Sequence, residues 1–347
     1  MNLLDKMKKS GTIKGTEILS QSGFFNKKDS VPTEIPIINM ALSGTVDGGL
    51  ISGLTFLAGP SRHFKSLLGL IMVKAYMSKY KDAVCLFYDS EFGITPDYIK
   101  TNGIDTERVL HIPIEHLEQL KFDISKRLET IERGDKVIIF IDSVGNLASK
   151  KEVEDALEGK SVADMTRARV LKSLWRIVTP HLTTKDIPCI AVNHTYQTME
   201  IYSKAVMSGG TGGMYSANQV FIIGKAQEKD GTDLVGYNFT INIEKSKFPF
   251  LITFDGGIQK YSGLVDIAIE GGFVSKPSPG WYSKIDLDTG EVGDKVRFDA
   301  TQTDEFMLPL LKSDKFKEYV NQKYGIAYGN IMGESNPILL QEEEDAA

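Results

Sequence analysis

The sequence predicts an α/β protein with a doubly wound, mostly parallel sheet, and three patterns indicate this fold class. Short apolar runs alternate with longer segments whose apolar residues recur at helical spacing. Residues 137–141 are apolar throughout, as expected of a strand that is covered on both faces. A segment of phosphate-binding type, residues 59–66, connects the first strand of this series to its first helix.

Each element follows from its own local pattern. Residues 53–58 and 83–88 are short apolar runs that predict strands, and residues 66–79 between them predict a helix. Residues 117–132 place apolar side chains at positions 117, 120, 124, 128 and 131, which gives a helix one apolar face. The same reasoning predicts a helix over residues 161–178 and strands over 137–141, 187–192 and 220–224.

The pattern changes near residue 238. Residues 238–244 alternate Phe239, Ile241 and Ile243 with polar residues, which is typical of an antiparallel strand with one solvated face. After residue 257 the chain resembles a smaller α+β unit, and it ends in an acidic run, residues 342–345. We expect that run to be disordered.

Composition excludes several classes of protein. With 40 basic and 46 acidic residues the net charge is −6, so any nucleic-acid binding must come from local patches and not from a polycationic chain. Cys85 and Cys189 are too few for a disulfide framework or a four-cysteine zinc site, and we expect both in the core. The N-terminus lacks a secretory signal, and no apolar run approaches the roughly 18 residues of a membrane span. We therefore expect a soluble, cytoplasmic protein.

Residues 59–66 read Gly-Pro-Ser-Arg-His-Phe-Lys-Ser and lie between a predicted strand and a predicted helix. In a P-loop, backbone N–H groups hold phosphates, the Lys reaches the β and γ oxygens, and the Ser hydroxyl ligates Mg²⁺. Phe64 stands where the pattern has its second glycine, which we expect to be tolerated only if the backbone there keeps a negative φ. The candidate phosphate-binding residues are Gly59, Pro60, Ser61, Arg62, His63, Phe64, Lys65, Ser66 and Leu67.

Two acidic residues follow predicted strands. Asp142, next to Ser143, ends an apolar run in the Walker-B arrangement, where the carboxylate holds the Mg²⁺ shell together with Ser66. Glu91 lies just past the strand over residues 83–88, in the crevice where open α/β sheets bind ligands. There Glu91 can polarise the water that attacks a γ-phosphate. Together these segments predict a magnesium-dependent ATPase core.

The order of motifs resembles the core of the RecA-type recombinases. After the P-loop come Asp89-Ser90-Glu91, Ile141-Asp142-Ser143, Val192-Asn193-His194 and Gly209-Gly210-Thr211-Gly212-Gly213. Residues 85–93 and 193–196, with the Phe in the P-loop, are similar more narrowly to the UvsX-type recombinases of T-even bacteriophages. The resemblance implies an N-terminal oligomerisation element over 1–30, a RecA-like P-loop ATPase core over 31–258, a small α+β C-terminal domain over 259–335 and an acidic tail over 336–347.

The family implies an activity and partners. We expect an ATP-dependent DNA strand-exchange recombinase that uses ATP and Mg²⁺ and serves homologous recombination, repair and recombination-dependent replication. It would form head-to-tail helical filaments on single-stranded DNA, with the pair Phe24-Phe25 docking on the next core. Expected partners are single-stranded and double-stranded DNA, further copies of the chain, and a recombination mediator and a single-strand-binding protein of the same phage, in the host cytoplasm.

The resemblance also assigns roles to single residues. Tyr98 would stack on adenine, His194 would sense the γ-phosphate, and Lys245 and Lys247 would reach the ATP of the neighbouring subunit as catalytic residues beside Glu91 and Lys65. Two DNA-binding loops are implied, over residues 149–163 and 195–213; the second is also long and aperiodic, as mobile functional loops are. The expected DNA contacts are Arg167, Thr195, Tyr196, Met199, Lys204, Gly212 and Gly213.

Two alternatives remain open at the level of sequence. A hexameric RecA-fold helicase would share the P-loop, Asp142 and Glu91 but couple hydrolysis to translocation. A non-hydrolysing, DNA-binding accessory paralogue would keep the nucleotide site for structure alone, and Phe64 in the P-loop is compatible with it. Electron microscopy of rings or filaments separates the first from a recombinase, and ATP turnover with and without single-stranded DNA separates the second.

Overall fold

A computed structural model describes residues 3–13, 16–22, 29–160, 166–198, 205–243, 246–255, 257–286 and 289–325. Phe24, Phe25 and the acidic tail over 336–347, which carry predictions above, lie outside these ranges.

A nine-stranded sheet forms the centre of the molecule, in the order β11-β10-β9-β8-β1-β5-β4-β2-β3. From β8 to β3 neighbouring strands run parallel, while β9, β10 and β11 are antiparallel to their neighbours. The parallel part confirms the predicted fold class. Its strands are β1 (Gly53–Ala58), β2 (Val84–Asp89), β3 (Val109–Pro113), β4 (Val137–Asp142), β5 (Pro188–Asn193) and β8 (Gln219–Asp230).

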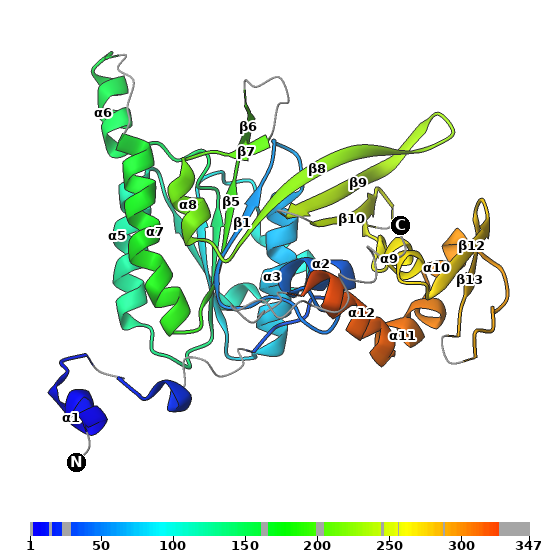
Figure 1. Cartoon of the computed structure of the whole chain (residues 1–347). Helices are drawn as coiled ribbons and strands as arrows, with labels where there is room; N and C mark the ends of the chain where they lie inside the picture. The colour runs from blue at the N-terminus through cyan, green and yellow to red at the C-terminus, as the bar shows by residue number, and fades with distance from the viewer. Residues whose placement is uncertain are drawn as a thin grey trace.

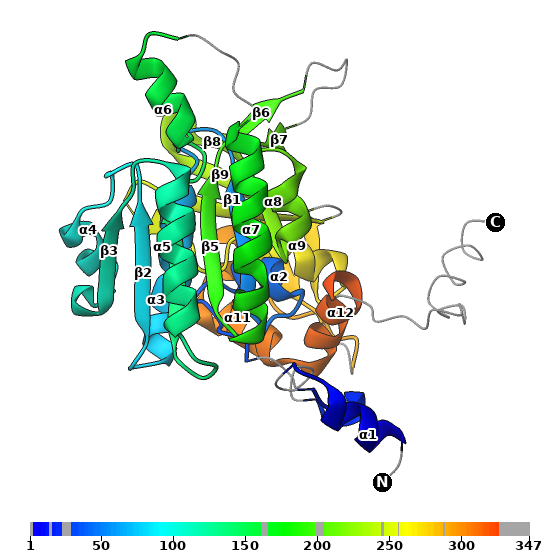
Figure 2. The same ribbon diagram turned by 90° about the vertical axis from the view of Figure 1, so that its left-hand side faces the viewer.

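Helices cover both faces of the parallel part, as Figures 1 and 2 show. One face packs on α2 (Pro36–Ser43) and α3 (Lys65–Lys79) through a core that includes Leu57, Phe140 and Val192. The other face packs on α5 (Leu117–Thr130) and α7 (Thr166–Thr184) through a core that includes Phe56 and Trp175, whose rings meet edge to face at 5.1 Å. Alternate residues of each strand therefore enter different cores, which explains why these strands are apolar throughout.

The antiparallel part begins with a long two-stranded ribbon. Strand β8 continues past the predicted end at residue 224 to Asp230 and turns into β9 (Asp233–Ile243), and the pair projects well beyond the sheet (Figure 1). The alternation at residues 239, 241 and 243 predicts this strand correctly, because Phe239 and Ile241 are fully buried. Strands β10 (Ser246–Thr253) and β11 (Gly257–Ile258) complete the sheet edge.

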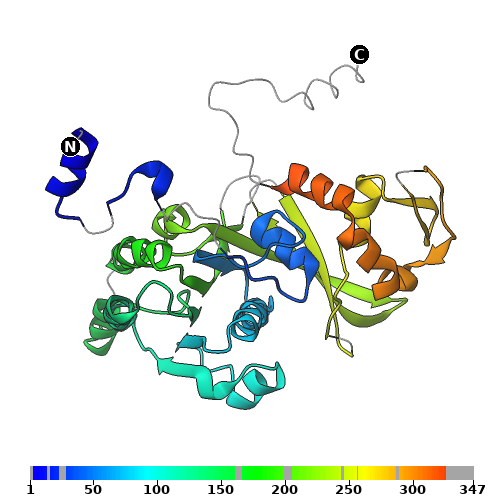
Figure 3. The same cartoon turned by 90° about the horizontal axis from the view of Figure 1, so that it is seen from below.

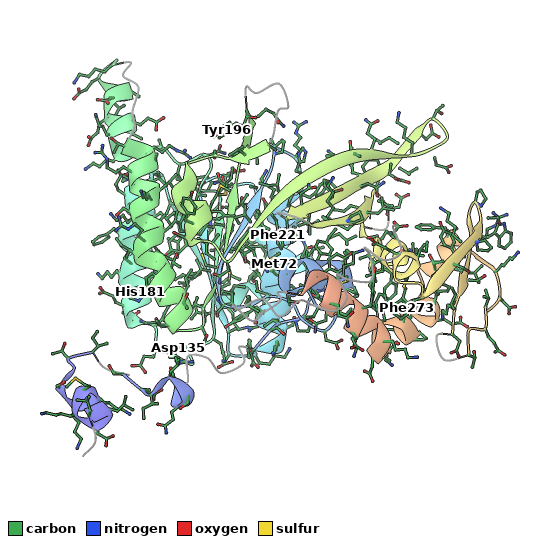
Figure 4. The ribbon with its side chains drawn as sticks, in the orientation of Figure 1. Met72, Asp135, His181, Tyr196, Phe221 and Phe273 are labelled. Carbon is green, nitrogen blue, oxygen red and sulfur yellow. The ribbon has the colours of Figure 1, made fainter. Side chains whose placement is uncertain are left out.

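The C-terminal unit shares the core of the α2 and α3 face. Phe273 and Phe316 meet edge to face at 5.1 Å, and Phe248 of β10 contacts Tyr324, so the core is continuous from the sheet into this unit. Figure 3 shows the unit beside the sheet, and Figure 4 labels Phe273 within it and Met72 and Phe221 in the core of the sheet. Its elements are α9 (Leu264–Glu270), β12 (Val274–Ser278), β13 (Trp281–Lys284), β14 (Val296–Arg297), α10 (Phe298–Thr301), α11 (Asp304–Lys312) and α12 (Asp314–Tyr324).

At the N-terminus, α1 (Leu3–Ser10) and the short 3-10 helix η1 (Leu19–Gln21) stand apart from the core in all three ribbon views. None of their residues is buried, and the apolar side chains of Leu3, Met7 and Leu19 are each more than half exposed.

Several elements differ from the sequence-based expectation. The first DNA loop was expected over residues 149–163, but α6 (Lys150–Leu157) is helical there, because Ser149 and Glu152 form a reciprocal capping box. The second loop has an ordered base, made of the hairpin β6 (Thr195–Gln197) with β7 (Ala205–Met207) and of α8 (Thr211–Ser216). The sequence analysis did not predict α4 (Pro96–Thr101), the 3-10 helix η3 (Thr106–Arg108) or β3. These three elements are short and have weak periodicity.

The two cysteines, Cys85 and Cys189, are buried and unbonded as expected, and burial raises the pKa of Cys85 to about 12. In the part of the chain that the structure describes, no helix combines the length and apolar character needed to cross a membrane.

We predict that Gly69→Ala destabilises the fold by about 2 kcal/mol, the range typical of overpacked cores. A Cβ at residue 69 of α3 would lie 2.4 Å from Cε2 of Phe140 on β4, so helix and sheet must move apart. The measurement is urea unfolding followed by circular dichroism. Gly293→Ala is the control, since its Cβ meets only Lys284 O at 3.6 Å; equal stability of both variants would contradict the packing.

Candidate functional site

Four neighbouring parallel strands end at one edge of the sheet and present the predicted site residues there. The phosphate loop follows β1, and Glu91, Asp142 and His194 lie at the ends of β2, β4 and β5. These groups surround a cavity of about 520 Å³. Its lining comprises Ser61, Arg62, His63, Phe64, Lys65, Ser66, Leu67, Glu91, Gly93, Ile94, Tyr98, Asp142, Val192, His194, Lys225 and Tyr237. The structure therefore brings the predicted P-loop, Walker-B and Glu91 segments together.

Lys65 begins α3 and is almost fully buried, with 6% of its surface exposed. Its Nζ donates a 2.7 Å hydrogen bond to the carbonyl of Pro60, which closes the loop on itself. Burial lowers the pKa of Lys65, while the charges of Glu91 and Asp142 act in the opposite direction. A phosphate group in the cavity would give this ammonium a partner of full charge.

Phe64 corrects one expectation. Its φ is +51°, so the backbone at the second glycine position is left-handed and the expected negative φ is wrong. The phenyl ring packs edge to face on Phe239 of β9 at 5.1 Å, which compensates for a conformation that costs about 1–3 kcal/mol in a residue other than glycine. Arg62, two residues earlier, is also left-handed, with φ +60°.

Asp142 has the features expected of a metal ligand. It is 3% exposed, its Oδ1 has no hydrogen-bond partner, and the Ser66 hydroxyl is hydrogen-bonded to the carboxyl group. Burial, followed by the charges of Glu91 and Asp89, raises the pKa of Asp142 to about 6 although the Ser66 bond opposes it. A divalent cation would use the unpartnered oxygen and stabilise the ionised carboxylate.

The donor set fits Mg²⁺ better than a transition metal. Mg²⁺ typically keeps several waters and takes one or two protein ligands together with phosphate oxygens, which Ser66 and Asp142 can complement. No cluster of three or more His, Cys, Asp or Glu side chains suited to a metal occurs among the residues for which the structure gives positions.

Glu91 is held by the segment that follows β4. Its Oε1 accepts hydrogen bonds from Ser143 Oγ at 2.6 Å and from Asn146 Nδ2 at 2.9 Å. Ser90 fixes the same two segments, since its Oγ donates to Ser143 O at 2.8 Å and accepts from Ser143 N at 3.0 Å. Asp89 Oδ1 accepts from the N–H groups of Glu91 and Phe92, so the turn that carries Glu91 is fixed on both sides.

His194 lies next to Glu91, with 3.6 Å between its Nε2 and Oε1 of the glutamate. Burial, then the nearby charge of Lys65, lowers the pKa of His194, so the imidazole is neutral at physiological pH. The ring packs against Gly145, where a Cβ would lie 2.4 Å from Cδ2 of the imidazole. A glycine is therefore required at residue 145 for His194 to approach the Glu91 segment.

A second, larger cavity adjoins the first. It has a volume of about 810 Å³, lies between α3 and residues 31–35, and shares Leu67 and Tyr98 with the phosphate cavity. Tyr98 is in α4, whose first turn is capped by Thr95, and the residue is 43% exposed. The predicted adenine-binding residue thus stands where the two cavities meet.

Arg167 is engaged within the chain. Its guanidinium donates to the carbonyls of Leu147, Val144 and Gly145 at 2.8, 3.1 and 2.8 Å, so it supports the segment that holds Glu91. The expected contact between Arg167 and DNA stays a prediction, and it would compete with these three bonds.

The remaining predicted residues are more scattered. Tyr196 is 54% exposed on the β6–β7 hairpin, and Figure 4 shows it at the base of the loop, next to Thr195 in the chain. Gly212 and Gly213 lie in α8, where added Cβ atoms would be 2.9 Å from Lys172 and 3.1 Å from Phe56, so both glycines are closely packed against neighbouring side chains. Met199, Lys204 and Lys245 lie outside the described residues.

Lys247 is exposed on β10, opposite Asn242, and does not line the cavity of its own chain. Among the site residues to which the sequence analysis gave no role are Asn146, Lys225 and Tyr237. Lys225 and Tyr237 lie more than 150 residues beyond the phosphate loop on an amphipathic ribbon, and no local motif distinguishes them. Asn146 follows Asp142 by four residues, and this spacing matches no known motif. Only the folded turn brings Asn146 to Glu91.

Comparisons with known proteins agree with this geometry. Residues 19–254 match the model of the RecA N-terminal domain, and residues 261–320 match that of the C-terminal domain of the bacteriophage T4 recombination and repair protein. The chain is 54% identical to the recombination and repair protein of Enterobacteria phage T4, covering 99% of this chain and 90% of the relative. It is 28% identical to a RecA protein of Mycobacterium sp. (strain KMS) over 73% of each chain, and 25% identical to one of Cutibacterium acnes over 77% of each.

We predict that Asp142→Asn stabilises the nucleotide-free chain by about 2 kcal/mol at pH 7.5, because a folded-state pKa near 6 exceeds the unfolded value near 4. Ionisation of Asp142 therefore destabilises the native state as pH rises from 4 through 6, and Asn removes this penalty. The gain should disappear at pH 4, as measured by urea unfolding at both pH values.

Asp123→Asn is the matched control with the opposite sign. Burial of Asp123 acts against the shift, but hydrogen bonds from Arg127 and Tyr88 lower its pKa, so this carboxylate stabilises the fold above its unfolded pKa. Asp123→Asn should destabilise the chain at pH 7.5. A destabilised Asp142→Asn variant at that pH would contradict the assignment of a buried carboxylate with an unpartnered oxygen.

Proposed function

Because this chain belongs to the RecA family and is a RecA-like strand-exchange recombinase, we propose that it works as a DNA-dependent ATPase on single-stranded DNA. The observation that carries the proposal is that Lys65, Glu91 and Asp142 line one cavity at the ends of parallel strands. A nucleotide-dependent enzyme of this family needs these three groups within reach of one triphosphate.

The nucleotide would span both cavities. We propose that the phosphates occupy the 520 Å³ cavity, where the N-terminus of α3 and Lys65 attract negative charge, and that the adenine lies against Tyr98. Mg²⁺ held by Ser66 and Asp142 would neutralise charge on the β and γ oxygens. The unpartnered oxygen of Asp142 supports this assignment.

Glu91 is the proposed base for the attacking water. A carboxylate that accepts bonds from Ser143 and Asn146 is fixed in direction, and only its second oxygen needs to take a proton. His194 contacts the same carboxylate and lies between β5 and the β6–β7 hairpin. We propose that it links the γ-phosphate to the hairpin that carries Tyr196.

Between subunits, we propose a head-to-tail filament. A heterologous interface of this kind gives an open helix when the rotation does not close. The largely exposed apolar residues of α1 support its role as a docking element. Exposed Lys247, with Lys245, would reach the nucleotide of the next subunit. A mediator and a single-strand-binding protein of the same phage remain proposed partners, and the domain limits at residues 30, 258 and 335 remain part of the proposal.

A strand-exchange assay with circular single-stranded and linear duplex DNA tests the proposal as a whole. Joint molecules that require ATP and Mg²⁺, together with filaments in electron microscopy, are expected. Closed rings without filaments would favour a hexameric helicase, and turnover that DNA does not stimulate would favour an accessory protein.

We predict that Glu91→Gln lowers ATP turnover about 10²- to 10⁴-fold, the contribution typical of a general base, while nucleotide binding is kept. The amide still accepts bonds from Ser143 and Asn146 but cannot take a proton. Phosphate release and nucleotide binding are measured on the same preparation. Glu129→Gln, an exposed change on α5, is the control, and turnover retained by the Glu91 variant would show that another group is the base.

We predict that Tyr196→Ala weakens binding of single-stranded DNA about tenfold, since stacking of a base on an aromatic side chain contributes about 1–3 kcal/mol. Fluorescence anisotropy with a labelled oligothymidylate at two salt concentrations measures this effect. Phe122→Ala removes an even more exposed aromatic residue, 73% against 54% for Tyr196, on the outer face of α5 and should leave DNA affinity unchanged. Equal losses in both variants would contradict a role for the β6–β7 hairpin.

A further inference from the structure

The β8–β9 ribbon contacts the phosphate loop at two points. Nζ of Lys225 donates to the carbonyl of Arg62 at 3.4 Å, and the same ammonium lies 3.6 Å from the ring centroid of Tyr237. The ring of Phe239 meets that of Phe64 edge to face at 5.1 Å. Lys225 and Tyr237 also line the phosphate cavity, so the ribbon forms one of its walls.

These two contacts fall on the two strained residues of the loop. Arg62 and Phe64 are the positions between Gly59 and Ser66 whose φ is positive without being glycine. Such conformations persist only where the surrounding structure holds them. The contact made by Phe239 explains why a bulky aromatic residue can occupy a position where P-loops have glycine.

The pairing of β8 with β9 holds both contacts in place together. Lys225 and Phe239 are directly paired across β8 and β9, so their side chains lie on the same face of the ribbon. Phe239 is fully buried and also stacks on Phe250 of β10 at 5.6 Å, which anchors it in the sheet. The ammonium of Lys225 is directed by the ring of Tyr237, as cations over aromatic faces are.

We propose that Lys225 and Phe239 are positioning residues for nucleotide binding, which hold the phosphate loop in its binding conformation through Arg62 and Phe64. The inference rests on the proposed nucleotide site. Backbone N–H groups bind phosphate only when the loop has the correct shape, and a loop that is already shaped loses less entropy on binding. The ribbon is thus the second half of the phosphate site, supplied from a distant part of the sequence.

The test for Lys225 is calorimetric titration with Mg·ADP and with the non-hydrolysable triphosphate Mg·AMP-PNP. Lys225→Met should weaken both ligands by the same factor, about five- to tenfold, because the loop shape serves every phosphate. Lys225→Arg should restore binding, since a guanidinium can donate to the Arg62 carbonyl and stack on Tyr237. A loss confined to AMP-PNP would overturn the proposal in favour of direct contact with the γ-phosphate, and unchanged affinities would overturn it outright.

The test for Phe239 is a double-mutant cycle with the same ligands. Phe239→Leu should weaken Mg·ADP about fivefold in the native chain but have no effect in a Phe64→Gly background, where the ring contact is already absent. Phe273→Leu is the matched control, because it removes another edge-to-face contact of 5.1 Å in the C-terminal unit, far from the phosphate loop. Independent effects of the two substitutions, or an equal loss in the Phe273 variant, would overturn the proposal.

Failure of the inference and failure of the proposed function are distinguishable. If the native chain binds neither ADP nor AMP-PNP, the proposed nucleotide site is wrong and the inference is overturned with it. If the native chain binds both and the variants bind equally well, the function stands and the ribbon is not a positioning element. Melting temperatures without nucleotide show that each variant is folded.

Discussion

The hydrogen-bonded register of the parallel strands is the constraint on which the site depends. Asp89 pairs with Asp142 across β2 and β4, and Ala58 pairs with Asn193 across β1 and β5. Parallel pairing places the carboxyl ends of all four strands at one edge of the sheet, so the phosphate loop, Glu91, Asp142 and His194, which lie at or just past these ends, face the same crevice. A one-residue slip in any pair would turn its last side chain to the opposite face.

Two charged side chains, Lys65 and Asp142, lie at that edge of the sheet, and the fold does not fully offset the cost of burying them. Lys65 and Asp142 are both nearly buried, burial lowers the pKa of the first and raises that of the second, and an oxygen of Asp142 has no partner. Buried charges are costly unless they are paired. A phosphate for Lys65 and a cation for Asp142 would supply the missing partners, which is why the free energy of ligand binding and the stability of the fold are linked here.

A set of hydrogen bonds fixes the segments next to these charged residues. The segment after β4 holds Glu91 through Ser143 and Asn146, and Arg167 of α7 holds that segment through three carbonyls. The region over residues 149–163, which we propose to contact DNA, directly follows this segment, so it is joined through the chain to the hydrogen bonds that hold the proposed base. The β6–β7 hairpin joins this set through His194. If the proposed DNA and nucleotide sites are correct, these few polar side chains would connect them.

The sequence by itself determined the parallel core and the three motifs of the site, because periodicity and strand-end residues are local signals. It placed Gly59–Leu67, Glu91 and Asp142 correctly at the sheet edge, since parallel strands with helical crossovers leave no other arrangement. The sequence could not place Asn146, Lys225 or Tyr237, whose roles depend on contacts across the fold. Only the tertiary structure decided the backbone at Phe64: local sterics predict a negative φ, and the ring of Phe239, 175 positions further along the chain, stabilises a positive one. Local rules describe a residue among its neighbours in sequence, whereas packing energy depends on its neighbours in space.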